Sequence, residues 1–134
     1  MEDWKIKVSV LWIFYAVALV GYFTLYLVEP GVLEQFLLSG EIGGEKIGPE
    51  LLLFFAILVL APLTMAFLSL ILKDSANRWA NIIVGIIFTA FQLIALIETL
   101  TLPTVYAYAV LMELSKVIAP ALIVWYAWKS KQKA

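Results

Sequence analysis

Two residues of opposite charge, Glu113 and Lys116, interrupt an otherwise apolar stretch near the end of the chain. On an α-helix, a separation of three residues is about 4.5 Å along the axis, so the two side chains can meet on one face. A charge at the centre of a membrane-spanning helix costs about 2.5–3.5 kcal/mol, and an opposite charge beside it offsets part of that desolvation cost. The spacing therefore predicts a carboxylate–ammonium pair that faces a bundle interior or a partner chain.

Gln92, Pro62 and Pro120 extend this polar constellation. Gln92 stands near the middle of another apolar stretch, and Pro120 removes the helical hydrogen bond to the carbonyl of Lys116. Pro62 weakens the helix of its own stretch in the same way. We expect Gln92, Glu113 and Lys116 to form a ligand site or ion path, with Pro62 and Pro120 as hinges.

The same residues have other interpretations. Glu113 and Lys116 can be a structural ion pair that fixes helix register, Gln92 can join two helices, and proline is tolerated in membrane-spanning helices. The pair can also lie between protomers. Glu98, near the end of its apolar stretch, is expected to reach water. The residues alone leave these alternatives open.

Cysteine and histidine are both absent from the 134 residues. Their absence removes disulfides, thiol chemistry and the usual zinc and transition-metal ligands. The sequence also has no phosphate-binding glycine loop, nucleophile elbow or dinucleotide fingerprint. We therefore expect no metal and no cofactor, and a non-enzymatic role is favoured. A membrane enzyme that acts on a lipid or quinone through a carboxylate is the least favoured function.

The elements that must position these residues are apolar blocks. Hydrophobic residues make up 64% of the chain and charged residues 14%, against about 45–50% and about 25% in soluble domains. Mean hydropathy is +1.01. The net charge is −1, and the basic residues other than Lys116 lie outside the apolar blocks and form no single patch, so nothing favours nucleic acid as a partner. The expected partner is the lipid bilayer.

Four blocks reach the roughly 20 residues that a helix needs to cross the bilayer. The predicted spans are about 8–28, 50–72, 79–100 and 104–128, within a single transmembrane domain that covers 1–134. Short connections favour antiparallel neighbours. The predicted fold is thus all-α, an integral membrane four-helix bundle with up-down-up-down topology.

The connections carry their own signals. About six residues, 73–78, are expected to join the second and third spans, and about three, 101–103, the third and fourth. In the long connection between the first two spans, apolar residues at helical spacing in 31–38 predict either a short interfacial helix or an ordered loop. The glycine-rich stretch 39–46 predicts a turn or a small hairpin.

Basic residues are distributed unequally between the two ends of the predicted bundle. One end has seven and the other only Lys46. The seven are Lys5, Lys7, Lys73, Arg78, Lys129, Lys131 and Lys133. Because lysine and arginine in short loops favour the cytoplasmic side, both termini are predicted to be cytoplasmic.

Three stretches carry a resemblance to a known family: 5–12 (KIKVSVLW), 76–83 (ANRWANII) and 123–129 (IVWYAWK). They resemble an uncharacterised family of small prokaryotic four-helix membrane proteins, a domain of unknown function. The overall plan is more loosely similar to DoxX-like bundles. The resemblance implies a multi-pass protein of the prokaryotic cytoplasmic (inner) membrane and no established activity. Pro62 and its neighbours stand where the family leads us to expect an acidic residue.

These observations favour a non-enzymatic ligand-binding or accessory subunit, as a homo-oligomer or within a larger membrane complex. The alternative is an oligomeric transporter or channel with a polar path through Gln92, Glu113 and Lys116.

Overall fold

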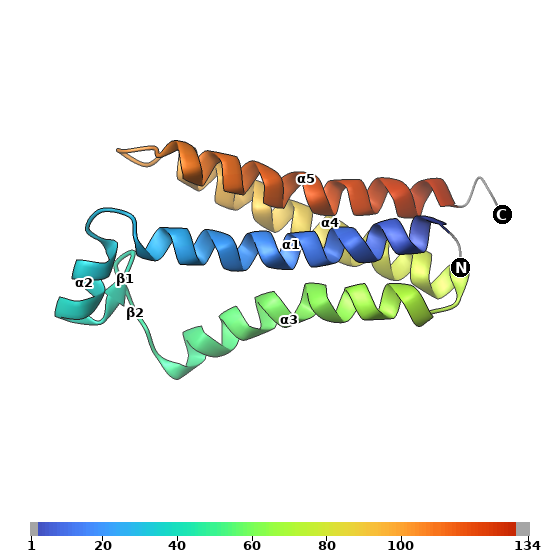
Figure 1. The fold of residues 1–134 in the computed structure, drawn as a ribbon, viewed down its shortest axis with the longest axis horizontal. Helices are drawn as coiled ribbons and strands as arrows, with labels where there is room; N and C mark the ends of the chain where they lie inside the picture. Colours follow the sequence, from blue (N-terminus) through green and yellow to red (C-terminus); the bar gives the residue numbers. More distant parts are fainter. Residues whose placement is uncertain (1–2, 131–134) are drawn as a thin grey trace.

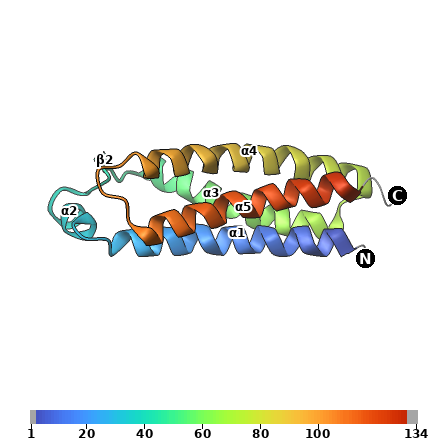
Figure 2. The same cartoon turned by 90° about the horizontal axis from the view of Figure 1, so that it is seen from above.

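The computed structural model describes residues 3–130. In this range the chain forms five helices and one two-stranded hairpin. In chain order they are α1 (Asp3–Leu27), α2 (Val32–Ser39), β1 (Glu41–Ile42), β2 (Glu45–Lys46), α3 (Pro49–Ile71), α4 (Asp74–Leu100) and α5 (Ala107–Lys129). The four long helices run along one axis, with α2 and the hairpin at one end and both ends of the described chain at the other (Figures 1 and 2).

Helices α1, α3, α4 and α5 contain 23 to 27 residues and are long and apolar enough to cross a membrane. At 1.5 Å per residue, even the shortest is about 34 Å long. Their outward faces are apolar: Val17, Leu53, Ile94 and Leu111 are each at least 60% exposed. Such a surface is compatible with lipid contact. The helices themselves confirm the predicted all-helical architecture with four long apolar helices.

The helices do not pack in the simple order that the sequence suggested. α1 packs against α3 and α5, and α5 also packs against α4, whereas α3 and α4 contact each other only sparsely. We expected every pair of consecutive helices to lie side by side. The short connection holds α3 and α4 together at one end only, and Figure 1 shows the opposite end of α3 turned away from the bundle axis. This arrangement opens one side of the bundle.

The connection between α3 and α4 is also shorter than predicted. α4 begins at Asp74, so most of 73–78 is helical and only Leu72 and Lys73 remain between the helices. Asp74 lies in the first helical turn, where its negative charge is favourable to the helix dipole. The amide of Asn77 already donates to the carbonyl oxygen of Lys73. The polar residues that read as a loop are therefore the first turn of α4.

A small cap closes the other end of the molecule. α2 ends at Ser39 and is capped by Gly40. Gly40 has a positive φ of 70°, and its amide donates to the carbonyl oxygen of Phe36. Gly43 and Gly44 have φ of 61° and 86° and form the two-residue turn between β1 and β2. Positive φ at both central residues is the requirement of the tight hairpin turn that glycine satisfies best.

The core is built around three aromatic rings. Trp12 and Tyr15 of α1 both pack edge-on against Phe88 of α4, with ring centroids 5.7 Å and 5.3 Å away. α4 and α5 approach closely at Gly85. A Cβ atom there would lie 2.7 Å from Cγ2 of Val124, so only glycine fits without a shift. The bundle is thus densely packed at mid-length.

Candidate functional site

Glu113 and Lys116 meet inside the bundle. Lys116 Nζ lies 2.6 Å from Glu113 Oε1, and the two side chains are 3% and 2% exposed. The same ammonium lies 3.8 Å from the centroid of the Tyr22 ring on α1, which is a cation–π contact. The second carboxylate oxygen, Glu113 Oε2, is buried and has no hydrogen-bond partner.

Gln92 of α4 is a further buried polar side chain at this level. Its amide nitrogen Nε2 donates to the hydroxyl of Tyr15. Its amide oxygen Oε1 is buried and has no partner. Gln92 and Glu113 therefore each present one unsatisfied acceptor, and an unsatisfied buried acceptor typically costs about 1–3 kcal/mol.

Both acceptors belong to residues that line one cavity of about 320 Å³, which we call the four-helix cavity. Lys116 lines it as well, so the structure brings the three predicted site residues together around one space. Six aromatic rings from three helices form much of the remaining wall: Tyr22, Phe23, Tyr26, Phe54, Phe55 and Phe91. The volume lies at the lower end of the range of about 300–1,000 Å³ that is usual for small-molecule sites.

The position of the cavity follows from the helix packing. It is lined by α1, α3, α4 and α5, and it lies where α3 and α4 have separated. Pro62 and Pro120, the expected hinges, are buried inside α3 and α5, and neither lines the cavity. Glu98 is exposed and belongs to the cavity lining, which places a second carboxylate at its rim.

A second polar cluster lies between the aromatic core and the ends of the chain. We call it the asparagine network; its members are Trp12, Ser69, Asn77 and Asn81. Trp12 Nε1 donates to Asn81 Oδ1 at 2.7 Å, and Asn81 Nδ2 donates to Asn77 Oδ1 at 2.7 Å. Asn77 Nδ2 in turn donates to the carbonyl oxygen of Ser69 at 2.7 Å. Every side-chain amide atom of the two asparagines is bonded, and the network joins α1, α3 and α4.

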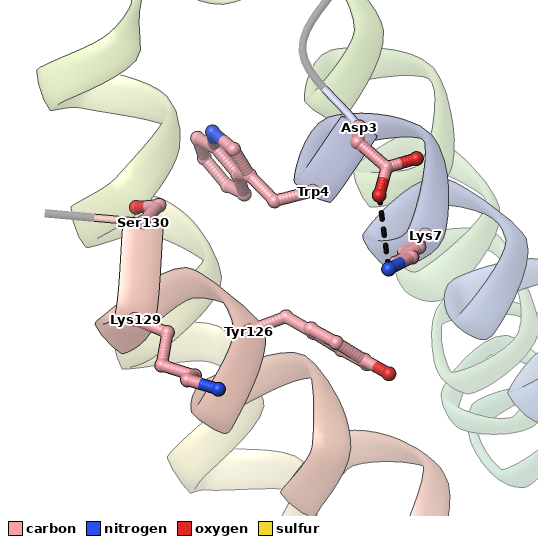
Figure 3. Close-up of a pocket in the computed structure, with 6 residues that line it drawn as sticks. All are labelled: Asp3, Trp4, Lys7, Tyr126, Lys129 and Ser130. Atoms are coloured by element: carbon pink, nitrogen blue, oxygen red, sulfur yellow. Dashed lines mark ion pairs between the residues drawn. The ribbon is translucent and has the colours of Figure 1, made fainter. Parts of the chain in front are cut away.

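Two further cavities lie toward the two ends of the bundle. A space of about 120 Å³ lies between the first turn of α1 and the last turn of α5. There Trp4 points toward α5 and Tyr126 toward α1, while Lys7 is paired with Asp3 at 2.9 Å (Figure 3). The other, about 410 Å³ and largely apolar, lies beneath the hairpin and shares Phe23, Tyr26 and Phe55 with the four-helix cavity.

Sequence reasoning missed the aromatic wall. Phe54, Phe55 and Phe91 lie in apolar blocks, where nothing distinguishes a cavity-facing ring from a lipid-facing one. Tyr15 and Tyr22 carried a signal, because they are seven residues apart on one face of a helix and a buried tyrosine hydroxyl needs a partner. Within residues 3–130, no group of three or more acidic, histidine or cysteine side chains could hold a metal ion.

The fold and the site define a class: a small helical protein with four long apolar helices around an amphipathic cavity. The chain belongs to DUF6326, a family of unknown function, whose model matches residues 1–134. The predicted resemblance to a family of unknown function is thereby confirmed, whereas the likeness to DoxX-like bundles stays a prediction. Comparison with curated proteins and with solved structures gave no significant match.

Proposed function

We propose that the protein crosses a lipid bilayer four times and binds a small amphipathic molecule in the four-helix cavity. The observation that carries the proposal is the pair of buried, unpartnered acceptors, Gln92 Oε1 and Glu113 Oε2, on residues that line a cavity with aromatic walls. Most buried polar groups in proteins have a hydrogen-bond partner, and exceptions need an explanation. A bound molecule that supplies the missing partners is that explanation.

The asparagine network supports this interpretation. The same short chain satisfies both buried asparagine side chains at its other level, so the bundle is able to pair polar groups internally where they serve packing. Unpaired acceptors on residues that line a cavity favour a ligand over a purely structural role for Glu113 and Lys116.

The membrane orientation is part of the proposal. The ends of the described chain and the α3–α4 turn lie at one end of the bundle (Figure 1), and that end holds most of the basic residues. The positive-inside rule then favours this end as cytoplasmic. The prokaryotic inner membrane is part of the proposal through the family resemblance alone. The four-helix cavity would lie in the outer half of the bilayer, with the gap between α3 and α4 open toward lipid.

A transport path is less well supported than a binding site. Such a path would have to continue from the cavity toward the cytoplasmic end. Trp12 and Tyr15 are fully buried there and Phe88 is 8% exposed, so rings fill the centre of the bundle. The two asparagines of the asparagine network, Asn77 and Asn81, lie beyond them. A cavity that is closed at one end suits a binding protein. A channel needs a continuous polar path across the membrane, within one chain or across an oligomer.

Equilibrium dialysis of the protein in lipid nanodiscs tests the proposal. The probes are three radiolabelled compounds with a phenylbutyl body and a cationic, neutral or anionic head group. Empty nanodiscs give the contribution of partitioning into lipid. We expect saturable binding of at least one probe, at one molecule per chain. Light scattering on the same nanodiscs gives the copy number and tests whether the chain is an oligomer.

Two matched variants locate the binding. Ala95 lines the cavity, and Ala90 is exposed on the same helix outside it. Ala95→Phe should fill the cavity and weaken binding at least about tenfold, whereas Ala90→Phe should leave it unchanged. The proposal is wrong if no probe binds saturably, or if both variants bind as the unmodified protein does.

A further inference from the structure

We propose that the molecule held in the four-helix cavity carries a protonated amine that donates hydrogen bonds to Glu113 Oε2 and Gln92 Oε1. This inference rests on the proposed function and names the chemistry of its ligand. Three features of the cavity lead to it: the type of the unpartnered atoms, the balance of charge and the nature of the walls.

The unpartnered atoms are both acceptors. An ionised carboxylate and an amide oxygen can only accept hydrogen bonds, so the ligand must donate them. A carboxylate or phosphate head group has no proton to donate when ionised and would be repelled by Glu113. A quaternary ammonium has the right charge and no N–H. Groups with N–H or O–H donors remain, and we take the protonated amine as the charged case and the hydroxyl as the neutral case.

Charge separates the amine from the hydroxyl. The lining of the cavity includes two carboxylates, Glu98 and Glu113, and one ammonium, Lys116, so acidic groups are in excess by one. Lys116 uses only Oε1 of Glu113, which leaves Oε2 for a second cation. A hydrogen bond between an ammonium and a carboxylate is roughly twice as strong as one between neutral groups.

The walls suit an organic cation. Lys116 already lies against the face of Tyr22, at 3.8 Å from the ring centroid, so an ammonium and an aromatic ring pack together in this cavity. Phe54, Phe55 and Phe91 line the same space and offer further aromatic surface to the ligand. An inorganic cation has no organic body that could pack against these rings.

The apolar body of the ligand has room beside the head group. The cavity beneath the hairpin is largely apolar and shares Phe23, Tyr26 and Phe55 with the four-helix cavity. A body that extends from the acceptors toward α2 would contact both. The expected ligand is therefore a lipophilic primary or secondary amine, reached through the bilayer, with an aromatic or short alkyl body.

A head-group series on one body tests the inference. The probes are 4-phenylbutylamine, 4-phenylbutanol and trimethyl(4-phenylbutyl)ammonium, each measured by equilibrium dialysis against the protein in nanodiscs and against empty nanodiscs. We expect the amine to bind at least about tenfold more tightly than the alcohol or the quaternary ion, because only the amine combines charge with N–H donors.

Substitution of the carboxylate gives the second arm. Glu113→Gln should weaken the amine about tenfold or more and leave the alcohol within about twofold. Glu50→Gln is the matched control, because Glu50 is exposed at the start of α3 and lines neither cavity. Circular dichroism and gel filtration verify that each variant is folded, and the comparison of probes on the unmodified protein does not depend on any variant.

The outcomes separate the two proposals. If the alcohol or the quaternary ion binds as tightly as the amine and Ala95→Phe still abolishes binding, the cavity is a ligand site and the amine assignment is wrong. If Glu113→Gln leaves the amine unaffected, the assignment of its partner is wrong. If no probe binds saturably, the proposed function fails and the inference fails with it.

Discussion

The two levels of the bundle bury polar side chains in different ways. At the level nearer the chain ends, the two asparagines of the asparagine network pair with Trp12, Ser69 and each other. At the level nearer the hairpin, Gln92 and Glu113 each keep one acceptor without a partner. The first level carries amides and hydroxyls together with Arg78, whose Nε is also buried without a hydrogen-bond partner. The second carries an amide, a tyrosine hydroxyl and the charged pair Glu113 and Lys116.

Helix spacing accounts for the contrast. The turn between α3 and α4 brings Ser69 and Asn77 within reach of each other, so the network closes there. Farther along, α3 has left α4, and a cavity of about 320 Å³ takes the place of a contact. In this bundle, we therefore assign a structural role to a buried polar residue only where a neighbouring helix completes its hydrogen bonds.

The largest expected effect comes from breaking the Glu113–Lys116 pair. Lys116→Met should lower the free energy of unfolding by about 3–5 kcal/mol, because it leaves a buried carboxylate without its counter-charge. The double variant Glu113→Leu/Lys116→Met should recover most of that loss, since an apolar replacement of a buried pair is often close to neutral. Unfolding by sodium dodecyl sulfate, followed by circular dichroism, measures both. A double variant as unstable as the single one would show that the two charges are not coupled.

Asn81 should be the next most sensitive position, and its substitution tests the asparagine network. Asn81→Leu removes the acceptor of Trp12 Nε1 and the donor to Asn77 Oδ1. With two buried groups left unpaired, we expect a loss of about 3 kcal/mol in the same unfolding assay. Ser115→Ala is the control, because the Ser115 hydroxyl bonds only to the carbonyl oxygen of Leu111 in its own helix. A loss at Asn81 no larger than at Ser115 would contradict the structural role of the network.

The four long helices and the Glu113–Lys116 pair follow from local sequence signals. Apolar blocks of about 20 residues predict four long helices because length and hydropathy are properties of each block alone. The contact between Glu113 and Lys116 is likewise local, since a separation of three residues places both on one face of α5. The short helix α2 and the hairpin lie in the two stretches whose spacing and glycines suggested them.

The four-helix cavity and its unpartnered acceptors do not follow from local sequence signals in this way. Whether α3 lies against α4 depends on which of its faces packs on α1, and an almost uniformly apolar helix gives no periodicity to decide it. Nothing in the sequence therefore distinguishes Phe54 and Phe91 from lipid-facing residues. The unpartnered oxygens of Gln92 and Glu113 are a property of the assembled bundle, because a partner could have come from any neighbouring helix.

Substitution of Gly85 tests how closely α4 and α5 pack against each other. A Cβ atom at this position would lie 2.7 Å from Val124 Cγ2 and 3.4 Å from the carbonyl oxygen of Pro120. Gly85→Ala should lower the unfolding free energy by about 1 kcal/mol, as overpacking of about 1–3 kcal/mol outweighs the roughly 1 kcal/mol gained in helix propensity. Gly21→Ala meets only the flexible end of Met112, at 3.3 Å, and should be neutral or stabilising. Equal effects at the two glycines would mean that the α4–α5 contact is looser than the structure has it.

The smallest expected effect is at Gln92, and it sharpens the comparison most. Gln92 is as buried as Asn81, at 1% against 0% exposed, and a simple account based on burial alone predicts equal losses. Gln92→Leu, however, removes one unpartnered oxygen together with one hydrogen bond to Tyr15, so the two contributions nearly cancel and the loss should stay below about 1 kcal/mol. The unfolding assay used for Asn81→Leu measures it directly. A loss as large as that of Asn81→Leu would mean that the hairpin level is a second structural network, and the distinction between the two levels would disappear.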